Sequence, residues 1–166
     1  RSYGANRWQQ EVILRRGERA ITMRNWLLWQ EPWRMIKLAF AVNTSAPSAV
    51  HDVPFGWSER PCAGQEVPTH MWMDVSGPDP AGNPAGVALL NDGKYGCDVA
   101  GNTLRLTILR CVPYAYHKPP HTFGLRRRYD WIDQGEQAFT VVVCPHPGDW
   151  REAGIVPQAR LLNMPV

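Results

Sequence analysis

The stretch Gly86-Val-Ala-Leu-Leu-Asn-Asp-Gly-Lys-Tyr-Gly-Cys-Asp98 is followed closely by Thr103-Leu-Arg-Leu-Thr-Ile-Leu-Arg110. The first begins with an apolar run typical of a buried strand, and the second alternates like a strand with one buried face. Between them lies a polar, glycine-containing loop that carries Asn91, Asp92, Lys94 and Tyr95. Because polar loops held by rigid strands often carry binding sites, this loop is the first candidate site.

Period-two alternation recurs along the chain and predicts an antiparallel β-protein. Apolar residues occupy the even positions of 36–42, and 139–143 alternates in the same way before Pro145. We expect strands at 8–15, 19–31, 35–42, 48–55, 70–76, 86–91, 103–110 and 139–143. The first two would form a long hairpin around Arg16-Gly17-Glu18. With proline and glycine between so many strands, the predicted fold class is an all-β antiparallel sandwich.

Two proline- and glycine-containing segments, 56–69 and 112–134, are predicted to be long loops. The segment 151–163 is the one helix that we expect. Asp149 is a possible cap, and Glu152 stands three residues later, as in a capping box. Pro157 argues that this helix is short or kinked.

The composition indicates one domain, residues 1–166, with a substantial core. Hydrophobic residues make up 44% of 166 residues, and the net charge is only +3. This balance gives no support for a nucleic-acid or membrane partner, and no apolar run is long enough to span a bilayer. The basic run Arg126-Arg127-Arg128 is interpreted as a solvated loop face. Because the chain opens at Arg1 without Met, we expect it to be a segment of a longer protein.

The cysteine pattern predicts free thiols. The four cysteines are Cys62, Cys97, Cys111 and Cys144, and no pair has the two-residue spacing of a zinc ribbon or redox motif. In a chain of this length they need not form disulfides. We expect them to be mostly buried and reduced, which favours a cytoplasmic location.

Eight tryptophans are many for this length. Aromatic faces stack on sugar rings, so a carbohydrate partner is one interpretation. We favour the alternative that tryptophans in strands fill the core, namely Trp26, Trp29, Trp33 and Trp72. The core interpretation is weaker for the tryptophans near turns, namely Trp57, Trp131 and Trp150.

No catalytic or metal-binding motif is complete. His117 and His121 are four residues apart, but Pro119-Pro120 excludes the shared helical face of a zinc-protease motif. Cys144-Pro145-His146 could supply two ligands without an evident third, and no Gly-x-Ser-x-Gly nucleophile motif occurs. Glycoside hydrolysis needs two carboxyl groups across one bond. The candidate carboxylates form no recognisable pair: Asp92, Asp98, Asp130, Asp133, Glu136 and Asp149.

Two interpretations of the loop from Asn91 to Gly96 remain open. Asn91-Asp92-Gly93 is a strong turn signal, so the loop could be a tight hairpin with Lys94 and Tyr95 exposed. Alternatively, its amide, carboxylate, ammonium and phenol groups could recognise sugar hydroxyls, because each donates or accepts in a fixed direction.

Several blocks of the sequence, in order, resemble the C-terminal region of family 38 glycoside hydrolases, the α-mannosidases. The principal block is 90–110, beginning Leu-Asn-Asp-Gly-Lys-Tyr-Gly. The other blocks are 38–42, Val53-Pro-Phe-Gly-Trp-Ser-Glu-Arg-Pro61, Val112-Pro-Tyr-Ala-Tyr-His117, 133–139 and Pro145-His-Pro-Gly-Asp-Trp-Arg151. The resemblance covers about residues 8–166 and is closest to bacterial and cytosolic-type members. One departure is Cys97, where the motif usually has an aromatic residue.

The resemblance implies an antiparallel supersandwich like that of galactose mutarotase, with one short helix near the C-terminus. It also implies an enzyme that removes terminal α-linked mannose from glycans with retention of configuration. In the family, the nucleophile, the acid and a divalent metal, often zinc, belong to an N-terminal catalytic domain whose motifs are missing here. This chain would therefore carry no catalytic residue, metal ligand or cofactor, and we expect it to be inactive alone.

The resemblance further implies that this domain faces its catalytic domain and that the loop helps to wall the mannose pocket. The residues that would do so are Asn91, Asp92, Lys94 and Tyr95. Two alternatives remain: a non-catalytic carbohydrate-binding or structural module, and a scaffold surface for a homo-oligomer.

Overall fold

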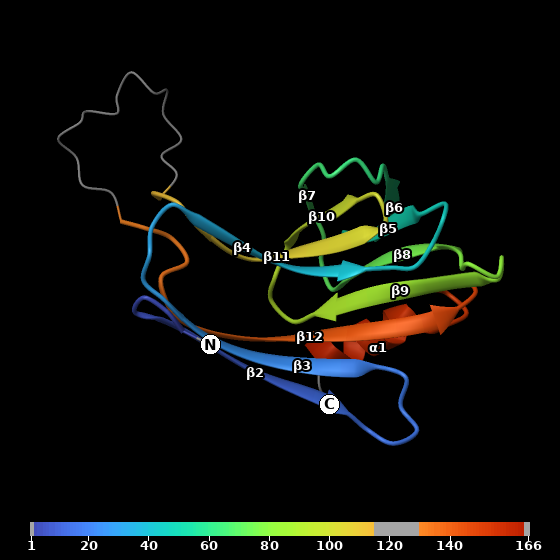
Figure 1. The fold of residues 1–166 in the computed structure, drawn as a ribbon, viewed down its shortest axis with the longest axis horizontal. Coiled ribbons are helices and arrows are strands. Elements are labelled where there is room, and N and C mark those ends of the chain that lie inside the picture. The colour runs from blue at the N-terminus through green and yellow to red at the C-terminus, as the bar shows by residue number, and fades with distance from the viewer. Residues whose placement is uncertain (1, 115–129, 165–166) are drawn as a thin grey trace.

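Two antiparallel sheets lie face to face in the computed structural model, which describes residues 2–114 and 130–164 (Figure 1). The strands of the larger sheet are β1 Ser2–Tyr3, β2 Asn6–Leu14, β3 Ile21–Trp29, β5 Ser48–Val53, β6 Gly56–Arg60, β8 Trp72–Pro78, β9 Pro84–Asn91 and β12 Gly135–Pro147. Those of the smaller sheet are β4 Arg34–Ala41, β7 Val67–Pro68, β10 Gly96–Ala100 and β11 Thr103–Cys111. The helix α1 spans Ile155–Asn163.

The eight-stranded sheet has the order β1-β2-β3-β12-β9-β8-β5-β6. The predicted hairpin forms its β2–β3 arm, with Leu14 opposite Ile21. β12 is longer than expected because Pro145 does not end it. β12 pairs with β3 only as far as Val143, whereas its pairing with β9 continues to Pro147. Beyond Val143 one edge of β12 is therefore unpaired, and proline, which has no N–H to donate, is tolerated there.

The smaller sheet has the order β4-β11-β10-β7 and covers one face of the larger one. The core between the sheets contains Leu89 from β9, Phe139 and Val141 from β12, and Leu104 and Leu106 from β11. The alternation of β11 places its apolar side chains inward, as the sequence predicts.

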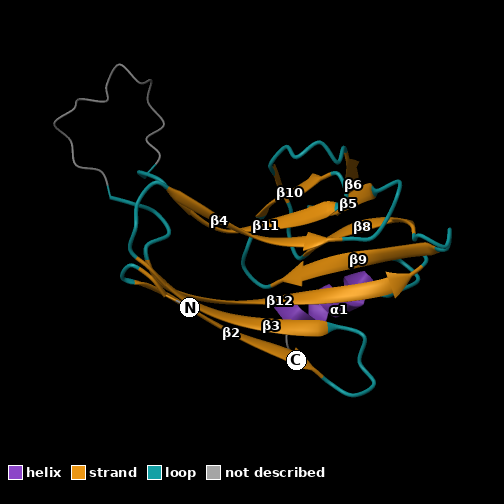
Figure 2. Cartoon of the chain, in the orientation of Figure 1, coloured by secondary structure: helices purple, strands orange, loops and turns teal. Residues whose placement is uncertain are grey.

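The opposite face of the large sheet packs against α1, as the purple helix in Figure 2 shows. Ala88 and Leu90 point to this side, where they meet Trp72, Ile155 and the other members of a second apolar cluster. β9 is therefore buried on both faces, which explains its continuous apolar run. The predicted antiparallel sandwich with a single short helix is confirmed for the described residues.

The prediction of a structureless loop at 56–69 is wrong, because β6 and β7 lie within it. Both are short edge strands with few apolar residues, so their period is weak in the sequence. In the predicted loop 112–134, Pro113 bridges to Trp131. Residues 115–129, with His117, His121 and Arg126–Arg128, lie outside the described residues.

The predicted capping box at Asp149 and Glu152 is also wrong. The helix starts later, at Ile155, with Gly154 as N-cap in the left-handed region (φ 67°) and no capping side chain. Asp149 Oδ1 instead accepts the amide N–H of Arg151 (2.7 Å) and orders the turn before the helix. Pro157 stands in the first helical turn, where no intrahelical hydrogen bond is lost.

The assignment of four tryptophans to the core is half correct. Trp29 and Trp72 are buried, but Trp26 and Trp33 are 44% and 68% exposed. Trp26 alternates with the buried Leu27 and so lies on the outer face of β3, while Trp33 follows β3 in a bend. All four cysteines are free thiols, and only Cys62 is partly exposed. No helix in the described part of the chain has the length and apolar composition to cross a bilayer.

Candidate functional site

The loop between β9 and β10 is fixed by the side chain of Asn91. Its Oδ1 accepts the amide N–H groups of Gly93 (3.1 Å) and Lys94 (2.7 Å), and its Nδ2 donates to the carbonyl of His70 (2.9 Å). The carbonyl of Asn91 in turn accepts from Asn163 Nδ2 in α1 (2.9 Å). Asn91 is 2% exposed, so it positions the loop and is not itself presented to a ligand.

Asp92 ties the same loop to the large sheet. Its Oδ1 accepts the amide N–H of Thr140 in β12 at 2.7 Å. Together Asn91 and Asp92 fix both the turn and its place against the sheet, as the turn interpretation requires.

Lys94 and Tyr95 have a different environment, because both line a cleft of about 440 Å³. Lys94 Nζ donates to Gln137 Oε1 (2.6 Å) and lies over the ring of Phe139, 4.8 Å from its centroid. Burial lowers the pKa of Lys94, against the charges of Asp133 and Asp92. Tyr95 is 59% exposed, so its phenol remains available at the rim.

Other walls of the cleft come from segments distant in the sequence. Glu66 precedes β7, Arg110 is the last residue but one of β11, and Asp133 precedes β12. Asp133 has φ 57°, and its Oδ2 accepts the amide N–H of Arg110 (2.9 Å). Sequence reasoning missed Glu66 and Arg110 because no local pattern brings them to the loop.

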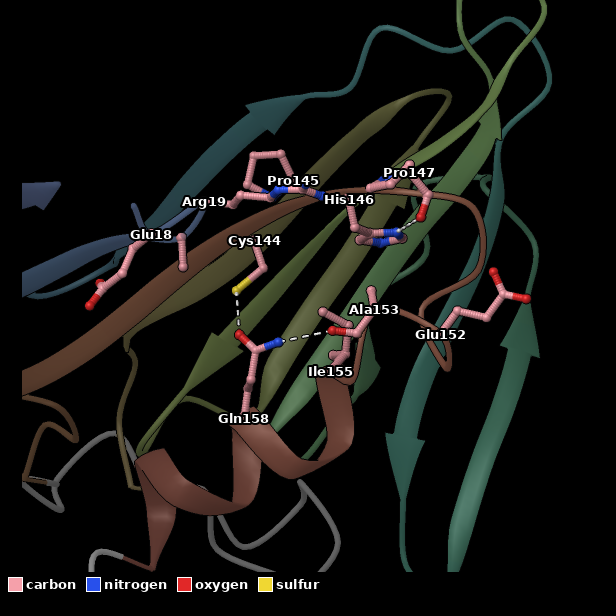
Figure 3. A pocket seen from close by; sticks show the side chains of 11 residues that line it. Glu18, Arg19, Cys144, Pro145, His146, Pro147, Glu152, Ala153, Ile155 and Gln158 are labelled. Carbon is pink, nitrogen blue, oxygen red and sulfur yellow. Dashed lines mark hydrogen bonds between the residues drawn. The ribbon is translucent and has the colours of Figure 1, made fainter. Parts of the chain in front are cut away.

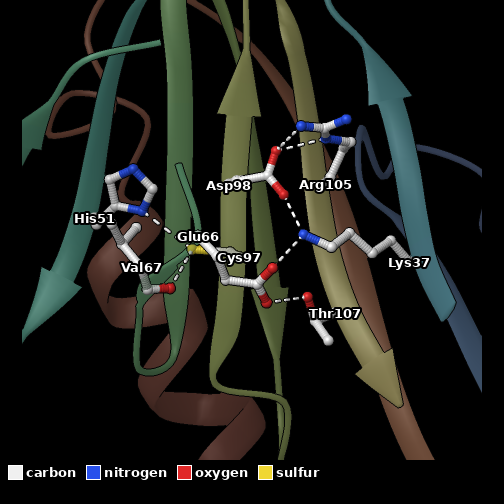
Figure 4. Close-up of polar contacts among 8 residues, drawn as sticks. All are labelled: Lys37, His51, Glu66, Val67, Cys97, Asp98, Arg105 and Thr107. Carbon is white, nitrogen blue, oxygen red and sulfur yellow. Dashed lines mark hydrogen bonds and ion pairs between the residues drawn. The ribbon is translucent and has the colours of Figure 1, made fainter. Parts of the chain in front are cut away.

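A charged cluster adjoins this cleft on the outer face of the small sheet (Figure 4). Lys37 pairs with Glu66 and with the buried Asp98, and Arg105 Nε also donates to Asp98 (2.5 Å). Burial opposes ionisation of Lys37, but hydrogen bonds to Asp98 and Glu66 raise its pKa. Glu66 also accepts from Thr107 Oγ1 at 2.5 Å, so this wall of the cleft is rigid.

A second cleft, of about 480 Å³, lies beside α1 (Figure 3). Its His146 bonds through Nε2 to the buried Asp74 (2.8 Å), and Ser76 donates to the same carboxylate. Histidine and serine thus both bond to the aspartate rather than to each other, which is not the order of a nucleophilic triad. Burial opposes protonation of His146, yet Asp74 raises its pKa.

Four of the candidate carboxylates have structural partners. Asp98 is held by two cations, Asp149 caps a turn, and Asp92 and Asp133 each accept a backbone N–H. Within residues 2–114 and 130–164, no three His, Cys, Asp or Glu side chains are grouped closely enough to hold a metal ion. The first cleft can bind or position polar groups through its charged and phenolic lining residues.

Comparison with known proteins agrees with the fold and the ordered blocks. The family described as "Glycosyl hydrolases family 38 C-terminal domain" matches residues 1–117. Alpha-mannosidase 2C1 of Mus musculus is 33% identical over 97% of this chain, and Alpha-mannosidase G of Dictyostelium discoideum is 30% identical over 81%. The chain covers only 14% and 12% of those two proteins.

The fold is shared with a solved α-mannosidase from Enterococcus faecalis V583, with a TM-score of 0.71 and 16% identity. That match covers 92% of this chain and 17% of the solved one. The fold and the ordered blocks thus define a C-terminal β-domain of a glycoside hydrolase. The chain belongs to glycosyl hydrolase family 38, whose characterised relatives named above are α-mannosidases.

Proposed function

We propose that this chain, residues 1–166, is one domain of a longer α-mannosidase and forms a wall of its active site. The parent enzyme would remove terminal α-linked mannose from glycans with retention. The nucleophile, the acid and a divalent metal such as zinc would come from the N-terminal catalytic domain of the same polypeptide. The mainly buried thiols fit a reducing compartment such as the cytoplasm.

The single observation that supports the site proposal is that the side chains of one loop have two different roles. Asn91 and Asp92 are committed to holding the backbone, whereas Lys94 and Tyr95 line the open cleft. Tyr95 presents an exposed phenol, and the ammonium of Lys94, which bonds to Gln137, has further N–H donors. A rigid loop with these groups can orient sugar hydroxyls at little entropic cost. We therefore assign mannoside contact to Lys94 and Tyr95, and a positioning role to Asn91 and Asp92.

Kinetics of the full-length parent enzyme test this assignment. Lys94→Met and Tyr95→Ala should each lower kcat/KM for an aryl α-mannoside by about 1–3 kcal/mol of transition-state stabilisation. Tyr3 is the matched control, since it is 60% exposed against 59% for Tyr95 but lies on β1, outside the cleft. Unchanged kinetics in both cleft variants would reduce the loop to a structural hairpin.

Asp92→Ala distinguishes the positioning role. It should lower kcat/KM by weakening the tie between the loop and Thr140, and Asp92→Asn should recover most of the loss because its amide oxygen can still accept. A loss that Asp92→Asn shares in full would instead indicate direct contact of the carboxylate with substrate.

The chain alone should not turn over aryl α-mannosides, even with added zinc, because the proposal places the nucleophile, the acid and the metal in the N-terminal catalytic domain. The measurement is release of the aryl group by the purified 166-residue chain compared with the full-length parent. Robust turnover by the chain would refute the proposal that this domain forms only a wall of the active site and that another domain supplies the catalytic residues.

A further inference from the structure

A third cleft, of about 420 Å³, lies between the β5–β6 turn and α1, away from the loop discussed above. Phe55 and Trp57 line it from the turn, and Arg160 lines it from the helix. Asp52 and His70 are also among its lining residues. Its volume is within the range of small-ligand sites, and its lining combines aromatic with planar polar groups.

Phe55 is an unusual residue type for the backbone position that it occupies. It follows Pro54 in the two-residue turn between Val53 and Gly56, with φ 67°, where glycine or asparagine is preferred. Its side chain is fully exposed at the same time. A bulky residue in the left-handed region that buries nothing in this domain suggests a contact with something outside it.

Trp57 provides a second aromatic surface, and its position is fixed. The guanidinium of Arg151 lies 4.6 Å from its ring centroid, and the ring meets Trp150 edge-on at 5.9 Å. Trp57 nevertheless remains 46% exposed. A rigid, half-exposed indole is a suitable platform for the apolar C–H face of a sugar ring.

Asp52 supplies a hydrogen-bond acceptor among the residues that line the same cleft. Its side chain is largely buried (8% exposed), and its Oδ2 accepts the amide N–H of Met71 at 2.9 Å. Among the described residues, Oδ1 makes no hydrogen bond, so this oxygen is free to accept one. Burial raises the pKa of Asp52, against the Met71 hydrogen bond and the charges of His70 and Arg160.

We infer that this cleft is a saccharide-binding subsite, in which a neutral pyranose ring stacks on Phe55 and Trp57 while its hydroxyls bond to Asp52 and Arg160. The balance of one carboxylate and one guanidinium favours an uncharged polyol over an anion such as phosphate. The choice of a saccharide as ligand rests on the proposed function, but not on the assignment of Lys94 and Tyr95.

Binding to the chain itself tests this inference without any need for activity. Methyl α-mannoside, titrated into the 166-residue chain, should change tryptophan fluorescence and show saturable binding, with Kd on the order of 1 mM. Phe55→Ala should weaken binding roughly three- to tenfold and Asp52→Asn by about tenfold or more. Trp33→Ala is the matched control, because that exposed indole lies outside the cleft and should leave Kd unchanged.

Three outcomes would overturn the inference. One is the absence of saturation up to roughly 50 mM sugar, well above the expected Kd. The second is equal binding of sorbitol, an open-chain polyol that cannot present a ring face. The third is unchanged affinity in Phe55→Ala, whose exposed side chain can be removed without loss of core packing. If Asp52→Asn fails to fold by circular dichroism, Phe55→Ala still decides the question.

Discussion

Gly86 has no side chain, and this allows Ser76 and His146 to pack closely against the backbone of β9. A Cβ atom there would lie 2.5 Å from Ser76 Oγ and 2.6 Å from His146 Cε1. His146 cannot retreat freely because it is bonded to the buried Asp74. We expect Gly86→Ala to lower the free energy of unfolding by about 1–3 kcal/mol in urea denaturation.

The control for this substitution is Gly93→Ala. No atom lies within 4 Å of the Cβ position of Gly93, and its φ is not positive. Its effect on stability should therefore stay within about 0.5 kcal/mol. Similar losses in both variants would show that the close approach at Gly86 is not the cause.

His51 predicts a pH dependence of stability. Burial, aided by the charge of Arg60, lowers its pKa to about 4, from an ordinary value of about 6.5 in the unfolded chain. Between these values the unfolded state binds a proton that the folded state does not, so stability falls as pH drops from 6.5 to 4. The contribution is on the order of 3 kcal/mol.

His51→Gln should remove this contribution. The stability advantage of the parent chain over the variant should be larger at pH 7 than at pH 4.5 when both are compared by urea denaturation. Titrating carboxylates are common to both chains and cancel in the difference. A constant advantage across this range would mean that the pKa of His51 is the same in the folded and the unfolded chain.

Helix α1 stabilises the molecule through one buried face. Ile155 is 1% exposed and packs in the cluster with Trp72 and Leu90, whereas Leu161 on the same helix is 64% exposed. Ile155→Ala should cost about 2–4 kcal/mol in chemical denaturation, and Leu161→Ala less than about 1 kcal/mol. A reversed order would mean that the exposed side of α1 is buried in solution, for instance in a homo-oligomer.

At the scale of helices and strands, the sequence predicts most elements but not every residue at which they begin and end. Strands such as β3 and β11 carry strong periodicity because their faces differ in burial, whereas β9 shows the continuous apolar run of a strand that is buried on both faces. β6 and β7 escaped detection because they are short edge strands stabilised mainly by backbone pairing with β5 and β10. Backbone pairing places few demands on side-chain type, so it is hard to recognise in a sequence. The same is true of the glycine N-cap of α1.

For the whole molecule, the free thiols predict stability that is independent of reductant. Cys97, Cys111 and Cys144 are buried, and Cys62 is partly exposed. Burial raises the pKa of Cys97 to about 12 and of Cys144 to about 11, so these thiols are unreactive while folded. The Tm should be the same with and without dithiothreitol, and a thiol reagent should label at most Cys62 rapidly. A drop in Tm on reduction would reveal a disulfide.

The sequence by itself determined the β-class, the main strands and the family, because face-by-face burial and turn chemistry are written locally along the chain. It also located the loop from Asn91 to Gly96, but left its role open. Only the tertiary structure separated Asn91 and Asp92, which hold the loop, from Lys94 and Tyr95, which line a cleft. It alone brought Asp52, Phe55 and Arg160 to one cleft. The reason is physical: which distant side chains meet is set by strand order and sheet packing, and backbone hydrogen bonds that fix this order are the same for almost every residue type.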